Sequence, residues 1–130
     1  MLHMIALMLL SQQALQPVAQ GEASYYTIAS TSPITASGEA MNDGLLTCAM
    51  REGNFGDYYL VVAEDGSSVI CKLNDRGPYI KGRVIDLSHA AMRKLHATAG
   101  LVKVKVYKVE VPVDLLKALS PQIIGLERPV

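Results

Sequence analysis

Hydrophobic and polar positions alternate in several short segments of this chain. In residues 101–111, LVKVKVYKVEV, almost every second residue is apolar, as in a strand with one buried and one exposed face. Residues 57–63 and 68–73 are rich in β-branched and aromatic residues, and a turn containing Asp65-Gly66 joins them. Because Asp-Gly tolerates the positive φ of a tight turn, these two runs predict a β-hairpin.

Two more strands are predicted, at residues 22–28, which contain Tyr, Thr and Ile, and at residues 83–85. The segments 31–44 and 74–78 are rich in residues that favour turns, and they predict loops. A chain of 130 residues, half of them apolar, is expected to form one domain with one core. Many short strands and closely spaced turns favour a small, mainly β barrel.

One helix is predicted to begin after Ser88, whose hydroxyl can accept an otherwise unpaired backbone N–H. Apolar residues from Ala90 to Ala99 then follow a helical spacing. Gly100 can end this helix.

The chain has no net charge at neutral pH, so its bulk charge gives no reason to expect a nucleic-acid partner. The charges are unevenly distributed, however. Residues 22–65 contain seven acidic side chains and one basic one, whereas residues 71–108 contain nine basic and two acidic ones. This split can give one face a positive potential that suits an anionic polymer, and solvated strand and helix faces are the alternative.

The N-terminal segment has features of a targeting signal. Residues 4–10, MIALMLL, are apolar but too few to span a bilayer, which needs about 20 such residues. They are typical of the centre of a secretory signal, and Ala19 and Gly21 supply small residues for cleavage. The first twenty residues contain no Lys or Arg, so an amphipathic helix that packs on the domain is the alternative. We predict a targeting segment at 1–20, a barrel domain at 21–111, a tail at 112–130, export, and no transmembrane anchor.

Cys48 and Cys71 are the two cysteines, and two states are open to them. In an exported chain they could form a disulfide, and otherwise they could be buried thiols on neighbouring strands. Their spacing matches no metal site, and His3, His89 and His96 complete none. We expect no metal and no other cofactor.

Asp75 is a candidate for acid–base chemistry. It follows an apolar strand, lies between Asn74 and Arg76, and precedes a Gly-Pro pair. A carboxyl in a partly apolar cleft can have a raised pKa and act as a general acid. The alternative is structural, because an Asp in a turn accepts backbone N–H groups and could pair with Arg76 or Arg83.

Two other acids have plainer interpretations. Asp86 precedes Ser88 and the predicted helix, where the positive end of the helix dipole stabilises a carboxylate. We interpret Asp86 and Ser88 as structural residues. Glu39 lies in a polar loop and by composition is a surface acid.

Several motifs of this chain occur together in one known family. They are Asn-Asp-Arg-Gly-Pro at 74–78, Gly-Arg at 82–83, Asp-Leu-Ser at 86–88, Ala-Ser-Tyr-Tyr at 23–26 and Thr-Ala-Ser-Gly-Glu at 35–39. On these motifs the chain, from about residue 21 to residue 109, resembles the rare lipoprotein A family of bacterial cell-wall proteins. Expansins and barwin-like proteins are similar at a greater distance. The resemblance implies a mainly β fold, a six-stranded double-psi β-barrel with one short helix.

The resemblance also implies an activity. The family includes lytic transglycosylases, which cut peptidoglycan glycan strands and leave 1,6-anhydro-muramic acid ends. One carboxyl protonates the glycosidic oxygen and the 6-hydroxyl of the muramic acid attacks, unlike in two-carboxylate glycosidases. By motif position Asp75 is that acid, and Glu39 is a second acid that supports it. The implied location is the bacterial periplasm or cell envelope, where a monomer would act on peptidoglycan.

A groove for the glycan would also need groups that hold the sugars. Tyrosines could stack on sugar rings, although plain strand packing is the alternative for them. Arginines and an amide could contact the anionic wall. The predicted substrate-binding residues are Asn74, Arg76, Tyr25, Tyr26, Tyr79 and Arg83.

One position departs from the family pattern. Active members carry His at the end of a Leu-Thr-Ala-Ala-His motif, and this chain has Met50 there. Met can neither relay a proton nor orient a carboxylate, so the change bears on turnover and not on the fold. A carbohydrate-binding barrel that does not cut is therefore the alternative function. A secreted barwin-like protein with another target is a third.

Overall fold

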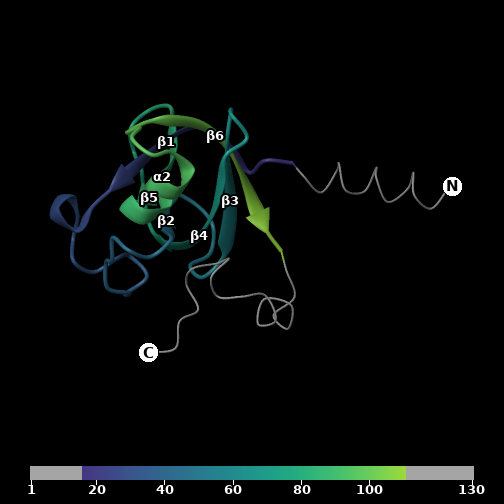
Figure 1. Ribbon diagram of the computed structural model, residues 1–130. Coiled ribbons are helices and arrows are strands. Elements are labelled where there is room, and N and C mark those ends of the chain that lie inside the picture. Colours follow the sequence, from purple (N-terminus) through teal and green to yellow (C-terminus); the bar gives the residue numbers. More distant parts are fainter. Residues whose placement is uncertain (1–15, 111–130) are drawn as a thin grey trace, which may run out of the picture.

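The structure, a computed structural model, describes residues 16–110 and contains a closed barrel of six strands (Figure 1). The strand order is β1-β5-β2-β4-β3-β6, so strands distant in sequence become neighbours. The predicted fold class, a mainly β barrel of six strands with one short helix, is confirmed. The elements are β1 (Ala19–Tyr26), the 3-10 turn η1 (Ile28–Ser30), β2 (Thr47–Ala49), β3 (Tyr58–Ala63), β4 (Ser68–Asp75), β5 (Arg83–Ser88), α2 (His89–Leu95) and β6 (Val102–Val109).

The barrel combines parallel and antiparallel strand pairs. β1 pairs parallel with β5, and β2 pairs parallel with β4, while the other pairs are antiparallel. The antiparallel pairing of β2 with β5 joins the two parallel pairs. β3 and β4 form the predicted hairpin, and Gly66 has a φ of 90° in its turn, as the Asp-Gly pattern indicates.

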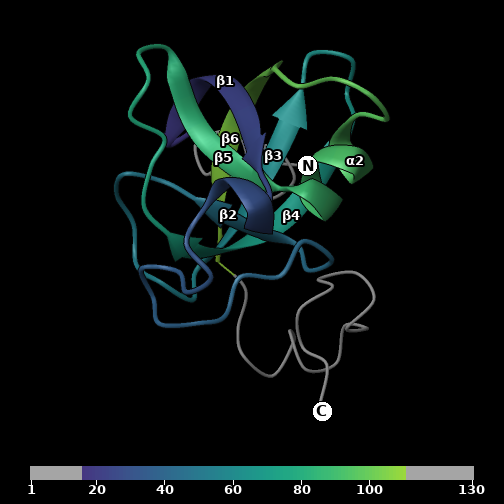
Figure 2. The same cartoon turned by 90° about the vertical axis from the view of Figure 1, so that its left-hand side faces the viewer.

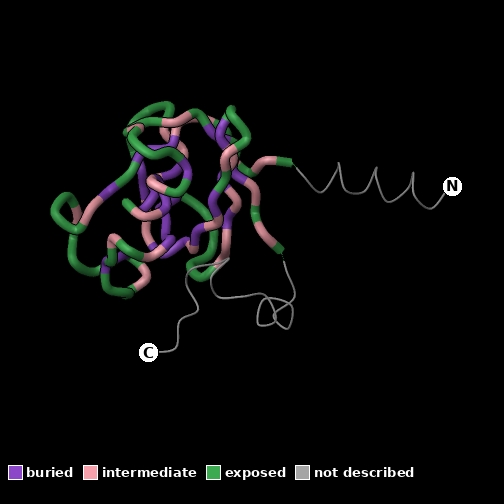
Figure 3. The backbone as a smooth tube through the Cα atoms, viewed as in Figure 1, coloured by how far each residue is buried: buried purple, intermediate pink, exposed green. Residues whose placement is uncertain are grey.

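Buried residues alternate with less buried ones along the strands (Figure 3). Val61, Ile85 and Val106 are fully buried, and each lies between half-buried or exposed neighbours in its strand. α2 adds Met92 and Leu95 to this core. Burial of an apolar side chain of this size stabilises the fold by about 1.5–3 kcal/mol.

The helix is shorter than its apolar spacing predicts. Ser88 is the N-cap, as expected, and its hydroxyl accepts a backbone N–H of the first turn. The helix nevertheless ends at Leu95 and does not reach Ala99. His96 is extended, and its Nδ1 accepts the backbone N–H groups of Thr98 and Ala99. This local capping competes with further helical hydrogen bonds, so His96 lies beyond the helix.

β1 begins at Ala19, three residues before the predicted strand. Residues 19–23 pair with β6, a contact that the N-terminal sequence does not reveal. A Cβ on Gly21 would lie 2.8 Å from the carbonyl oxygen of Gly82, so glycine permits β1 to approach the start of β5 closely. The two small residues of the predicted cleavage site therefore lie inside a paired strand.

The predicted apolar run at 4–10 and the predicted tail at 112–130 lie outside the described residues. Within the part of the chain that the structure describes, no helix is both long and apolar enough to cross a membrane.

The connection between β1 and β2, residues 27–46, extends from the barrel on the side of β2 and β4 (Figure 2). It is attached there by hydrogen bonds. The N–H of Ser37 donates to the carbonyl of Asn74 in β4, and the N–H of Ala90 in α2 donates to the carbonyl of Asp43. This connection therefore covers part of the outer face of the barrel near the end of β4.

Candidate active site

A row of paired residues crosses four neighbouring strands and brings two carboxylates to one face. Ser24 of β1 is opposite Asp86 of β5, Asp86 is opposite Ala49 of β2, and Ala49 is opposite Asp75 of β4. Directly paired residues point to the same face of a sheet. With strands about 4.8 Å apart, the backbones of Asp75 and Asp86 are separated by about 10 Å across Ala49.

Asp75 ends β4, and its carboxylate is held by backbone groups. Its Oδ1 accepts the N–H of Ala36, at 2.9 Å, and the N–H of Arg76, at 2.9 Å. Among residues 16–110 no partner is found for Oδ2, so this oxygen is available to a ligand. The side chain thus has the fixed orientation and the open oxygen that an acid–base group requires.

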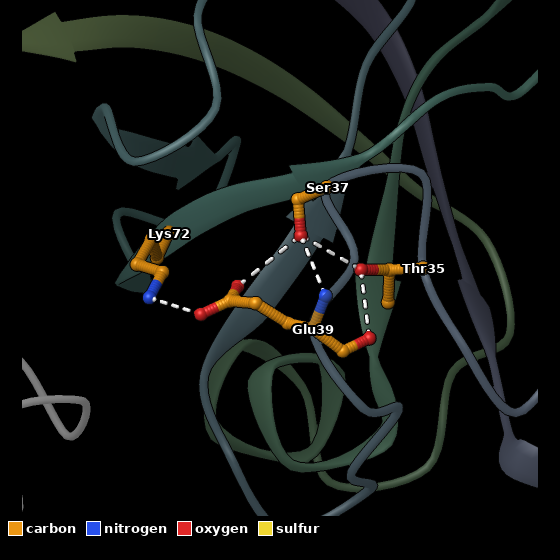
Figure 4. A network of polar contacts seen from close by, with 4 residues as sticks. All are labelled: Thr35, Ser37, Glu39 and Lys72. Atoms are coloured by element: carbon orange, nitrogen blue, oxygen red, sulfur yellow. Dashed lines mark hydrogen bonds and ion pairs between the residues drawn. The ribbon is translucent and has the colours of Figure 1, made fainter.

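Glu39 lies beside Lys72 of β4 (Figure 4). The connection that carries Glu39 is attached near the end of this strand, where the N–H of Ser37 donates to the carbonyl of Asn74. Its Oε2 lies 2.7 Å from Nζ of Lys72, and its Oε1 accepts a long 3.5 Å contact from the Ser37 hydroxyl. Thr35 bonds to Ser37 and to the Glu39 carbonyl, which closes the turn. The hydrogen bond from Lys72 is the main cause that holds the pKa of Glu39 below its ordinary value, so Glu39 is ionised at neutral pH.

Asn74 of β4 precedes Asp75 in the chain and contacts Glu39, and it is only 3% exposed. Its side chain also contributes to the lowered pKa of Glu39. Its Oδ1 is buried and has no hydrogen-bond partner within the described part of the chain. A buried acceptor without a donor costs about 1–3 kcal/mol, and a buried oxygen is not open to a glycan, so the contact with Glu39 is what links Asn74 to this site.

Asp86 lies on this face of the barrel, although its position before Ser88 predicted a structural role at the start of the helix. Its Oδ1 accepts the hydroxyl of Ser24 at 3.1 Å, which braces β5 against β1. Burial raises the pKa of Asp86, while Ser24 and Arg83 oppose this rise and the charge of Asp75 adds to it. The brace is therefore between two strands, and the carboxyl shares a face with Asp75.

The raised pKa of Asp86 predicts a pH-dependent effect of Asp86→Asn. A group with a raised folded-state pKa contributes stability that is present below its unfolded pKa and is lost as pH rises through the folded pKa. Asn can still accept the Ser24 hydroxyl but is never charged. We expect the free energy of unfolding of the variant, relative to wild type, to increase between about pH 3 and pH 7.

Urea unfolding at several pH values measures this difference. Asp57→Asn, at an acid that lies 3.6 Å from Lys108 outside this face, controls for the loss of one charge. A difference between Asp86→Asn and wild type that stays constant across the range would contradict the desolvation of Asp86.

The chain resembles known proteins in sequence and in fold. Residues 18–106 match the family model described as lytic transglycolase. The chain belongs to this family. The motif resemblance to cell-wall proteins of the rare lipoprotein A type is thereby confirmed.

Two curated relatives of this lytic transglycolase barrel illustrate the match. This chain is 40% identical over 86 residues to the endolytic peptidoglycan transglycosylase RlpA of Pasteurella multocida (strain Pm70). The match covers 65% of this chain and 29% of that protein. This chain is also 39% identical over 95 residues to the probable endolytic peptidoglycan transglycosylase RlpA of Treponema pallidum (strain Nichols). That match covers 72% of this chain and 30% of that protein. The chain therefore spans less than a third of the length of these relatives.

Solved structures share the fold of the lytic transglycolase barrel. The Streptomyces papain inhibitor aligns with a TM-score of 0.56 at 22% identity, over 71% of this chain and 94% of the inhibitor. The apo expansin of Clavibacter michiganensis aligns with a TM-score of 0.56 at 21% identity, over 72% of this chain and 51% of the expansin. With the family match, these likenesses identify the barrel as the predicted double-psi type.

Arg76 of the lytic transglycolase barrel is occupied by contacts within the protein. Its guanidinium donates to the carbonyls of Met50 and Glu52 at 3.3 Å and of Gly53 at 2.7 Å. It also lies 4.2 Å from the centroid of the Phe55 ring. The side chain thus supports the loop that follows β2, next to Asp75, and its donors point at that loop.

The three tyrosines predicted to stack on sugars lie in different environments. Tyr26 is buried, its hydroxyl lies 2.9 Å from the Thr47 hydroxyl, and burial raises its pKa. Tyr25 alternates with Ser24, so it faces the other side of β1, where its ring contacts His89. Tyr79 is 76% exposed and lies in the connection after Asp75. Of these three tyrosines, Tyr79 is the most exposed, and Tyr26 is the one on which the charge of Asp75 acts.

Two further residues complete the comparison with the sequence. Arg83 begins β5 opposite Glu22, and its charge acts on Asp86. Met50, at the position where the motif resemblance implies a His, is buried in the core cluster, and its N–H donates to the carbonyl of Asp75 at 3.2 Å. This position therefore adjoins Asp75, but its side chain is part of the hydrophobic packing.

Cys48 and Cys71 lie on the inner side of β2 and β4, beneath the outer face that carries the acids. Both are buried thiols in the structure, with their sulfurs 2.6 Å apart. Burial and the neighbouring thiol raise the pKa of Cys48. Within residues 16–110 no cluster of potential metal-ligating side chains is found.

A cavity of about 780 Å³ opens elsewhere, between β1, β3 and β6. Its polar lining includes Glu22, Lys103 and Lys105, and it contains neither Asp75 nor Glu39. Because acid–base chemistry needs positioned carboxylates rather than volume, we assign the candidate active site to the face with the acids.

Proposed function

We propose that this lytic transglycolase barrel cleaves the glycan strands of bacterial peptidoglycan and forms 1,6-anhydro-muramic acid ends. The observation that carries the proposal is the placement of Asp75 and Glu39 at the same end of β4, with one oxygen of Asp75 open. Membership of the family and the names of the relatives, which are peptidoglycan transglycosylases, support the choice of substrate.

In this proposal Asp75 acts first as acid and then as base. Its carboxyl gives a proton to the glycosidic oxygen, and the bond from that oxygen to the anomeric carbon of the muramic acid breaks. The resulting carboxylate takes the proton of the muramic acid 6-hydroxyl, whose oxygen forms the new bond to the anomeric carbon. No water is consumed, and the carboxyl is regenerated.

Glu39 and Asp86 have supporting parts in the proposal. Positive charge develops on the sugar ring as the glycosidic bond breaks, and the ionised Glu39 would stabilise it electrostatically. Asp86, on the same face across Ala49, would contact the adjacent part of the sugar. The exposed ring of Tyr79 and the cation of Arg83 would hold the strand.

A protein that acts on peptidoglycan must reach the cell envelope. We therefore propose export to the periplasm, which the peptidoglycan-related names of the relatives support.

The second candidate function is a wall-binding barrel without turnover. One observation favours it: Met50 takes the place of the family's His and is packed in the core, so it supplies no polar group beside Asp75.

The full chain incubated with purified sacculi tests the proposal. We expect soluble anhydro-muropeptides, identified by mass spectrometry, from sacculi that are intact or stripped of stem peptides. Absence of these products, together with pelleting of the protein with the sacculi, would favour the wall-binding function. Absence of both would overturn the proposed substrate.

A further inference from the structure

Lys72 points to the same face of the barrel as Asp75, although it lies three positions earlier in β4. An odd separation in a regular strand places side chains on opposite faces. The pairing with β2 shifts, however, because Thr47 is opposite Lys72 whereas Ala49 is opposite Asp75. Thr47 and Ala49 are two residues apart and share a face, so a bulge in β4 returns Asp75 to the side of Lys72.

Lys72 is the cation that ties Glu39 to this face (Figure 4). Its Nζ lies 2.7 Å from Oε2 of Glu39, a short charge-assisted hydrogen bond. The contact from the Ser37 hydroxyl is 3.5 Å long and therefore weak, and the Asn74 side chain lowers the pKa of Glu39 less than Lys72 does. The placement of the Glu39 carboxylate thus depends mainly on Lys72.

We propose that Lys72 is a positioning residue of this active site, whose ammonium holds the Glu39 carboxylate ionised and fixed beside the end of β4 that carries Asp75. The effect of Lys72 on catalysis rests on the proposed function, whereas its effect on the position of Glu39 rests on the 2.7 Å contact between the two side chains. The lowered pKa of Glu39, with the Lys72 hydrogen bond as its largest cause, agrees with this role. In the described part of the chain, Glu39 faces Lys72 and Asn74 of β4 and Ser37 of its own loop, and Asp75 lies further along β4.

Lys72→Met tests the placement directly, since it keeps an unbranched side chain and removes the charge. The ion pair is partly exposed, with side chains 22% and 44% accessible, so we expect the melting temperature to change by no more than about 4 °C. The titration midpoint of the Glu39 carboxyl, followed by carbon NMR, should move to higher pH in Lys72→Met and stay low in Lys72→Arg. An unchanged midpoint in Lys72→Met would overturn the placement.

The same variants in the sacculus assay test the catalytic consequence. A misplaced group can cost up to about 100-fold in rate, and we expect Lys72→Met to lower the rate at saturating sacculi about 10- to 100-fold. The half-saturating amount of sacculi should change little. The loss of activity on the acidic side should occur at higher pH than in wild type, because Glu39 then becomes protonated more readily.

Lys108→Met is the matched control, because Lys108 also pairs with carboxylates, Asp57 and Glu110, but lies outside the acid-bearing face. It should retain the wild-type rate and pH profile, and Lys72→Arg should retain most of the rate. If wild type cleaves and Lys72→Met has the same rate and profile, the positioning role is wrong and the proposed function stands. If wild type releases no product, the proposed function is wrong, and the Glu39 titration still decides whether Lys72 holds that carboxylate.

Discussion

Replacement of Asp75 by Asn is expected to lower the rate of anhydro-muropeptide release by about 10²- to 10⁴-fold, the usual contribution of a positioned general acid–base group. Asn has nearly the same shape, and its Oδ1 can still accept the N–H groups of Ala36 and Arg76. The variant should therefore keep the loop geometry and lose only the proton that the carboxyl carries. Mass spectrometry of the products released from sacculi measures the loss.

The control for this result is Asp65→Asn. Asp65 is a fully exposed acid in the turn between β3 and β4, where it accepts the N–H of Ser67, and Asn can do the same. Its rate should equal that of wild type. An Asp75→Asn variant that retains more than about a third of the wild-type rate while folded would rule out Asp75 as the acid, because a general acid contributes far more than that.

Oxidation of Cys48 and Cys71 to a disulfide is expected to stabilise the barrel by about 3 kcal/mol, since the bond would close a loop with a sequence separation of 23 residues. The two thiols are buried in contact on the neighbouring strands β2 and β4, and an exported protein meets an oxidising environment. The melting temperature should rise by at least about 10 °C relative to the reduced protein. Thermal unfolding with and without a reductant measures the change.

A matched variant separates the disulfide from other effects of the reductant. Cys71→Ala cannot form the bond, so its melting temperature should be the same in both conditions. Intact-mass spectrometry counts the thiols that remain. Wild-type protein that keeps two free thiols under air, and melts at one temperature in both conditions, would establish a reduced pair.

Local chemistry explains the elements that were predictable from the amino-acid order. The hairpin of β3 and β4 depends on Asp65-Gly66 and on apolar alternation, and the start of α2 depends on Ser88; both involve residues only a few positions apart. The end of α2 also depends on a local contact, from Nδ1 of His96 to the N–H groups of Thr98 and Ala99, but the helical apolar spacing as far as Ala99 gave no sign of it.

Arg76 and Tyr25 show why a residue's type does not determine its use. An arginine next to a candidate acid predicts a contact to an anionic ligand, but its guanidinium is directed to backbone carbonyls of the loop after β2. Tyr25 and Tyr26 are adjacent in one motif, yet strand alternation sends them to opposite faces. Proximity in the sequence therefore did not predict which groups share the site.

The order of residues indicated a small β barrel and carried the motifs of the family resemblance, and that resemblance implied Asp75 and Glu39 as the acids. Only the folded barrel revealed that Asp86 shares the face of Asp75 and that Lys72 holds Glu39. The physical reason is register. A sequence specifies how side chains alternate within one strand, but the row that joins β1, β5, β2 and β4 exists only when packing of the whole core sets those strands against one another.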